Sequence, residues 1–105
     1  MAEPRAYRHE DQFAAAVAAV AEKLSPDVVR IRYEFRNDWT GDPSVFFLIT
    51  VPDEVFTQRR TVEASEKISR AIRTEIEPWE EWDVRSYFDY RSASTQARVQ
   101  EPAWA

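Results

Sequence analysis

The sequence of 105 residues contains no cysteine, one glycine and one histidine. Without cysteine the chain can form no disulfide, no thiolate zinc site and no cysteine nucleophile. The single glycine, Gly41, excludes the glycine-rich loops that hold phosphates or dinucleotides, because such loops need two or three glycines. The single histidine, His9, excludes a metal site built from several histidines.

Acidic residues outnumber basic ones by 19 to 14, which gives a net charge of −5 and a pI near 4.9. Such a chain repels nucleic acid as a whole, although a local patch of arginines is still compatible with this balance. No apolar run reaches the ~18 residues needed to span a bilayer. Residues 1–11 lack the apolar segment of a signal peptide. We therefore expect a soluble cytoplasmic protein.

Two stretches have the spacing of amphipathic helices. Residues 11–24 place large apolar side chains on one helical stripe, with alanines filling most of the remaining positions. Residues 61–77 do the same with a stripe of isoleucines. Each helix is expected to end before a proline, Pro26 or Pro78, because the residue before a proline is pushed out of the helical region.

Three stretches are predicted to be strands: residues 29–36, 45–51 and 83–91. The first and third alternate apolar and polar side chains, which is typical of a half-buried strand. The second is apolar on both faces and therefore needs cover on both sides. Between the first two strands, residues 37–43 are rich in turn-forming residues and predict a hairpin loop.

The predicted order is therefore α-β-β-α-β, a two-layer α+β sandwich with two helices on one face of a three-stranded sheet. The helix between the second and third strands makes those strands parallel. We expect a single domain over residues 1–105, with residues 1–10 and 93–105 flexible. The C-terminal part is expected to fray, unless Val99 and Trp104 dock on the rest of the domain. In this arrangement the second face of the sheet has no covering layer.

The open face is the predicted contact surface. It combines arginines with large apolar side chains, a composition that favours a protein interface. We expect the contact to involve Arg30, Arg32, Trp39, Phe46, Leu48, Arg85 and Tyr87. The partner would be another protein or a second copy in a homodimer. A solvated face with cross-strand ion pairs is the simpler alternative.

RNA binding by the same face is a further alternative. Aromatic side chains flanked by arginines on an open sheet hold single-stranded RNA in several recognition modules. The net charge of −5 and the acidic Glu34 and Asp89 within the same face argue against it. Nucleic acid is therefore the less favoured partner.

No catalytic residue, metal site or cofactor site is expected. His9 lies in the polar N-terminal segment without an orienting partner, so a solvated histidine is the better interpretation. Asp38, Asp42, Asp53 and Glu54 are conceivable metal ligands, but aspartates are common in turns because they bond to nearby backbone amides. The interpretation is a non-enzymatic protein.

The hairpin carries the most specific string, Asp38-Trp39-Thr40-Gly41-Asp42-Pro43, which follows the strand from Ile31 to Phe35. It resembles a group of small uncharacterised bacterial proteins that are sometimes encoded beside proteins with a HEPN domain, a helical fold that includes many RNases. The resemblance implies an antitoxin-like or accessory role, in which an acidic protein masks a basic RNase. It carries over no catalytic residue.

The α-β-β-α-β order is also similar to that of ferredoxin-like regulatory domains, such as the cytoplasmic domain of cation-diffusion transporters. Domains of that kind bind metal through histidines and carboxylates. Because this chain has one histidine, the resemblance implies the shape without the metal role.

Overall fold

The three-stranded sheet is antiparallel on one side of its central strand and parallel on the other. The structure is a computed structural model that describes residues 3–105, with all of their side chains except those of Gln58 and Arg59. The strand order is β1-β2-β3, so β2 is central. The elements are α1 (Arg5–Arg8), α2 (Glu10–Leu24), β1 (Arg30–Asn37), β2 (Pro43–Val51), η1 (Asp53–Val55), α3 (Gln58–Ile76), α4 (Pro78–Trp82), β3 (Arg85–Ser92), α5 (Ala93–Val99) and η2 (Pro102–Trp104).

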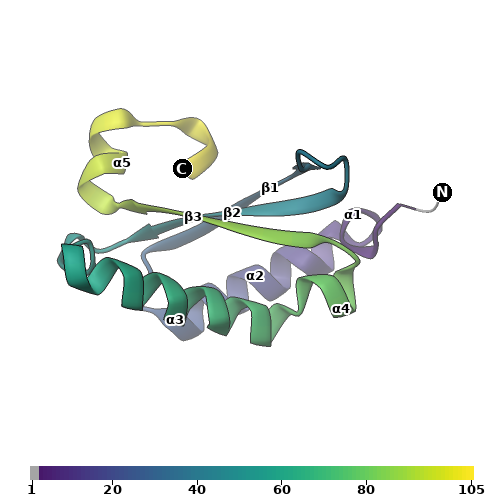
Figure 1. Cartoon of the computed structure of the whole chain (residues 1–105), viewed down its shortest axis with the longest axis horizontal. Coiled ribbons are helices and arrows are strands. Elements are labelled where there is room, and N and C mark those ends of the chain that lie inside the picture. The colour runs from purple at the N-terminus through teal and green to yellow at the C-terminus, as the bar shows by residue number, and fades with distance from the viewer. Residues whose placement is uncertain (1–2) are drawn as a thin grey trace.

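The two long helices, α2 and α3, cover one face of the sheet (Figure 1). β1 pairs antiparallel with β2, and β2 pairs parallel with β3, across the connection that contains α3. The predicted two-layer α+β sandwich with a three-stranded sheet is therefore confirmed. Each of the five predicted elements is present, and no end differs by more than three residues from the expected one.

The hydrophobic core lies between the helices and the inner face of the sheet. The central strand contributes Val45, Phe47 and Ile49, all with no exposed surface. Phe13 of α2 reaches into the same layer, and its ring centroid lies 6.2 Å from that of Phe47 and 5.2 Å from that of Trp82. Because side chains alternate along a strand, Phe46 and Leu48 point to the opposite, outer face.

The C-terminal segment corrects one prediction. Residues 93–105 were expected to fray, but they form α5 and η2 and fold back over one half of the outer face (Figure 1). Trp104 is only 4% exposed and Leu48 beneath this segment only 7%. The C-terminal segment thus covers the outer face of β2, and α2 and α3 cover its inner face, so both apolar faces of this strand are packed against the chain itself.

Polar contacts hold this segment on the sheet. The Arg91 guanidinium lies 4.3 Å from the Trp104 ring centroid and 3.1 Å from Glu101 Oε1. Arg32 donates a hydrogen bond of 2.9 Å to the main-chain oxygen of Ala105. The outer face is therefore half covered, not open along its whole length as the sequence suggested.

The N-terminal residues are also more regular than expected. Residues 3–10 include the short helix α1, whose Ala6 is completely buried. The ring of Tyr7 lies 4.7 Å from that of Phe35, measured between centroids. The prediction for residues 1–10 is wrong for this part, while residues 1 and 2 lie outside the described residues. Within residues 3–105 no helix is both long and apolar enough to cross a membrane.

Candidate functional site

The uncovered half of the outer face carries three neighbouring aromatic side chains, Phe46 of β2, Tyr87 of β3 and Trp39 of the β1–β2 loop, which we call the aromatic row. The ring centroids of Phe46 and Tyr87 are 4.9 Å apart with nearly parallel planes, 20° between them. Those of Tyr87 and Trp39 are 5.2 Å apart with a tilt of 56°. Trp39 is 81% exposed, so the row ends in a projecting indole.

The strand register explains why these side chains meet. Phe46 lies directly opposite Tyr87 across the parallel β2–β3 pair and opposite Glu34 across the antiparallel β1–β2 pair. Opposite residues on one face of a sheet lie within contact distance. Trp39 joins them because the tight loop turns its side chain back over the end of the sheet.

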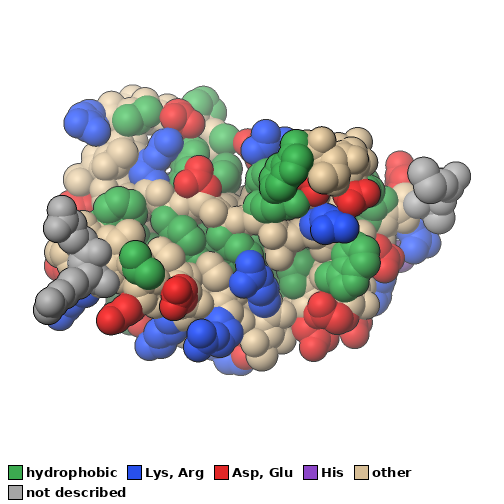
Figure 2. Space-filling view, viewed as in Figure 1, with side chains coloured by type: hydrophobic (Ala, Val, Ile, Leu, Met, Phe, Trp, Pro, Cys, Tyr) green, Lys and Arg blue, Asp and Glu red, His purple; other side chains and the backbone are tan. Residues whose placement is uncertain are grey.

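Two arginines flank the row. The Arg36 guanidinium lies 3.8 Å from the centroid of the Phe46 ring, a cation–π contact. Arg85 forms an ion pair of 3.0 Å with Asp42 and lies 5.7 Å from the ring centroid of Trp79, which is 60% exposed. The site is therefore a mixture of exposed aromatic and arginine side chains (Figure 2).

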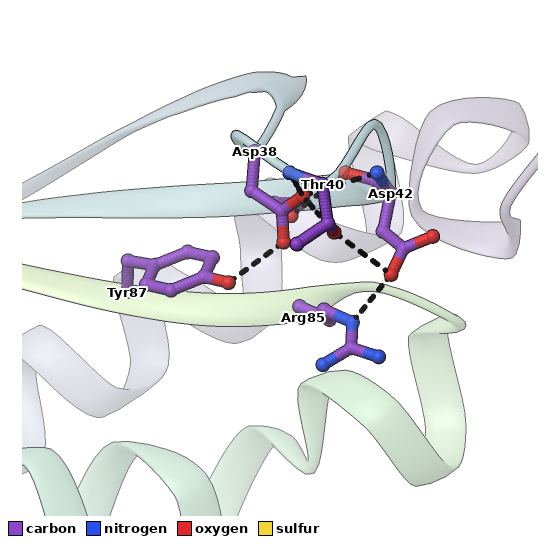
Figure 3. A network of polar contacts seen from close by, with 6 residues as sticks. Asp38, Thr40, Asp42, Arg85 and Tyr87 are labelled. Atoms are coloured by element: carbon purple, nitrogen blue, oxygen red, sulfur yellow. Dashed lines mark hydrogen bonds and ion pairs between the residues drawn. The ribbon is translucent and has the colours of Figure 1, made fainter.

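A hydrogen-bond network fixes the loop that presents Trp39 (Figure 3). Asp38 Oδ1 accepts from the backbone N–H of Thr40 at 2.9 Å, from that of Asp42 at 3.1 Å and from the Thr40 hydroxyl at 2.6 Å. Asp38 Oδ2 accepts from the Tyr87 hydroxyl at 2.7 Å. One carboxylate therefore closes the turn and also ties it to β3.

These bonds change the acidity of both partners. The hydrogen bonds from the Thr40 and Tyr87 hydroxyls stabilise the carboxylate and lower the pKa of Asp38. The same bond to Asp38 raises the pKa of the Tyr87 phenol, with desolvation adding to the effect. Asp38 is thus ionised and Tyr87 neutral at neutral pH.

The Asp38 carboxylate holds the loop and has no oxygen free of a hydrogen-bond donor. Both oxygens of Asp38 are occupied by donors and the residue is only 8% exposed, so it is poorly placed to act as a base. Among residues 3–105 no three or more histidine, cysteine, aspartate or glutamate side chains converge as metal ligands. What the network does achieve is a rigid loop with an exposed indole at its tip.

The structure brings together four of the seven side chains expected in the contact. Trp39, Phe46, Arg85 and Tyr87 share the uncovered half of the outer face. Arg30, Arg32 and Leu48 lie on the same face but toward its other half, where η2 packs against β1 and β2. Leu48 is buried there, and Arg32 is bound to Ala105.

Two members of the site were not among the expected residues. Asp38 was interpreted from the sequence as a turn former, which it is, but its bond to Tyr87 joins residues 49 positions apart. Arg36 ends the predicted strand of residues 29–36 and was given no specific role. The alternation of side chains in β1 and β2 places Arg36 and Phe46 on the same face of the sheet. Together with the register of the two strands, it would have predicted their contact.

Comparison with known proteins gives one similar fold. No protein-family model matches the chain, and no curated protein matches its sequence. A solved structure described as "MamM CTD - Copper form" is similar, with a TM-score of 0.58 and 19% sequence identity over 81% of this chain and 87% of that one. At this identity the likeness concerns the α+β fold and does not extend to copper.

Proposed function

We propose that this protein is a non-enzymatic interaction module that binds another protein through the aromatic row. The observation that supports this most is the exposure of Trp39 on a loop held rigid by Asp38. An exposed indole costs solvation free energy, and a rigid one loses little conformational entropy on binding. Tryptophan, tyrosine and arginine are also the residues most enriched at the energetic centres of interfaces.

The partner that we propose is a basic protein, with a HEPN-domain RNase as the first candidate. The resemblance of the hairpin string supports this class, and the net charge of −5 favours association with a basic surface. In this antitoxin-like role the protein would occupy the RNase surface. The cytoplasm of a bacterium is the compartment that this proposal implies.

Co-purification from the native host tests the proposal. We expect the tagged protein to retain a second protein in stoichiometric amount, identified by mass spectrometry and weighed by light scattering. Trp39→Ala should release it, whereas Val62→Ala, which shortens an exposed apolar side chain on α3, should not. A partner that binds both variants equally, or no partner at all, would contradict the proposal.

RNA binding by the same row is the second candidate. The observation that favours it is the placement of Arg36 and Arg85 beside aromatic rings. Against it, the ring of Phe46 is already in contact with both Tyr87 and Arg36, which leaves Trp39 as the ring most available for a base. Salt separates the candidates, because phosphate binding weakens steeply as the salt concentration rises and apolar contact does not.

A further inference from the structure

The free edge of β3 lies beside a groove. In strand order β3 is at the edge of the sheet, and within residues 3–105 it pairs with β2 alone. Figure 1 views the sheet with β3 in front and α3 below it. A groove of about 810 Å³ runs between them, lined by Ser69 and Arg73 of α3 and by Phe88 and Tyr90 of β3. Such an edge is a template for an added strand.

Hydrogen bonds indicate which residues of β3 offer backbone groups to that strand. The backbone N–H of Tyr90 donates a hydrogen bond of 2.9 Å to Asp89 Oδ1, and that of Val84 donates one of 3.1 Å to the carbonyl oxygen of Pro78. Backbone groups in a strand alternate between its two sides. The backbone of Ser86 and Phe88 is therefore directed away from β2, toward the open side of β3.

We propose that β3 pairs antiparallel with β3 of a second copy around a twofold axis at Tyr87, with the helices of both copies on the same face. The two three-stranded sheets then form one sheet of six strands. In this register Arg85 of each copy lies opposite Asp89 of the other, which gives two symmetric cross-strand ion pairs. The aromatic rows remain on the outer face, so the proposal does not rest on the partner protein proposed above.

The charges on the outer face of β3 favour a twofold axis at Tyr87 over an axis at the residues that follow it. An axis at Phe88 places Arg85 opposite Arg91 of the second copy, and an axis at Asp89 places Asp89 opposite itself; like charges in these positions are destabilising. An axis at Tyr90 also pairs Asp89 with an arginine, Arg91. Both arginines already bind a carboxylate, Arg91 that of Glu101 and Arg85 that of Asp42, but the Arg91 side chain is only 18% exposed whereas that of Arg85 is 52% exposed.

The helix below the strand has a matching charge order. Arg70 and Arg73 of α3 line the groove before Glu77, which follows α3, and Glu80 of α4, while Glu66 lines it ahead of both arginines. When two copies are antiparallel, the basic part of one such surface faces the acidic part of the other. Both the strand and the helix therefore favour the same relative orientation of the two copies.

The mass of the protein in solution tests the pairing. Light scattering of the wild type is expected to give twice 12.3 kDa. Asp89→Arg places arginine opposite arginine and should halve the mass, while Arg85→Asp combined with Asp89→Arg exchanges the charges and should restore it. A monomeric wild type, or a dimer that survives Asp89→Arg, would overturn the proposal.

A cysteine cross-link locates the axis independently of these charge variants. The chain has no cysteine, so Tyr87→Cys introduces a single thiol per copy. Directly opposite residues have Cβ atoms about 5 Å apart, close enough for a disulfide after a small adjustment. Mild oxidation should link Tyr87→Cys at least tenfold faster than the control Ala97→Cys, which is exposed on α5. Equal rates would place the axis elsewhere and refute the register.

Discussion

The Tyr87 hydroxyl donates a hydrogen bond of 2.7 Å to Asp38 Oδ2 and so connects β3 to the loop between β1 and β2. This bond is part of the reason that the pKa of Asp38 is lowered. Tyr87→Phe removes the donor, and we expect the pKa of Asp38 to rise toward its ordinary value. Titration of the Asp38 carboxyl signal by NMR measures the change.

Tyr90→Phe is the matched control for that variant. The Tyr90 hydroxyl bonds to Ser69 and to the main-chain oxygen of Ser65, under the sheet and away from the loop. This substitution removes a phenol of the same kind without touching Asp38. If Asp38 titrated alike in Tyr87→Phe and wild type, the bond between Tyr87 and Asp38 would not be the cause of its acidity.

Stability is expected to fall in acid because of the same carboxyl. The folded-state pKa of Asp38 lies below its ordinary value of 3.8. The stabilisation is therefore complete above 3.8, and it is lost as the pH falls below that value through the folded-state pKa. Asp38→Asn should be less stable than wild type at neutral pH, and the difference should narrow in acid. Urea unfolding at about pH 7 and about pH 3 measures both, and a constant difference would contradict the assignment.

The raised pKa of Tyr87 acts at the opposite end of the pH scale. A phenol with a pKa above its ordinary 10.0 in the folded state contributes stability that is complete below pH 10.0 and is lost as the pH rises through the folded-state pKa. We expect the difference in stability between wild type and Tyr87→Phe to shrink in this alkaline range. Thermal unfolding monitored across it would show the convergence, and a difference that grew instead would be inconsistent with the bond.

Two tryptophans of contrasting exposure test the role of the C-terminal segment. Trp104 is 4% exposed against the outer face, whereas Trp79 is 60% exposed. Replacing a buried tryptophan by alanine should cost about 3 kcal/mol of unfolding free energy. Trp79→Ala should stay within about 0.5 kcal/mol of wild type. Chemical denaturation compares them, and equal losses would show that the segment does not pack as described.

Gly41 gives the loop its left-handed turn, with φ of +88°. A Cβ at this position would meet nothing within 4 Å, so Gly41→Ala carries only the backbone penalty, about 1 kcal/mol. Asparagine tolerates this region better than alanine does, and Gly41→Asn should lose less. Thermal unfolding of the two variants provides the comparison. A larger loss for asparagine would be at odds with a purely conformational cost.

Local periodicity was sufficient to predict the main elements of the fold. The alternation in β1 and the isoleucine stripe of α3 reflect side chains that pack on the core, and Pro26 and Pro78 follow the two long helices. The two apolar faces of β2 correctly indicated cover on both sides. Each of these signals arises from neighbours in sequence, which is why a single chain reveals them.

The C-terminal cover was missed because its cause is not local. Residues 93–105 carry only two large apolar side chains, Val99 and Trp104, and they become ordered through contacts with β1, β2 and β3. For the same reason, only part of the hydrogen-bond network of Asp38 could be predicted from the sequence. Its bonds to Thr40 and Asp42 follow from turn chemistry, but its bond to Tyr87 depends on the register of β3.

Binding affinity for the co-purified partner tests the central claim most directly. Isothermal titration calorimetry would compare wild type with Trp39→Ala, using Val62→Ala as the control for an exposed apolar side chain outside the aromatic row. We expect Trp39→Ala to weaken binding at least tenfold, equivalent to about 1.4 kcal/mol, and Val62→Ala to leave it unchanged. Equal dissociation constants for wild type and Trp39→Ala would contradict recognition through the aromatic row.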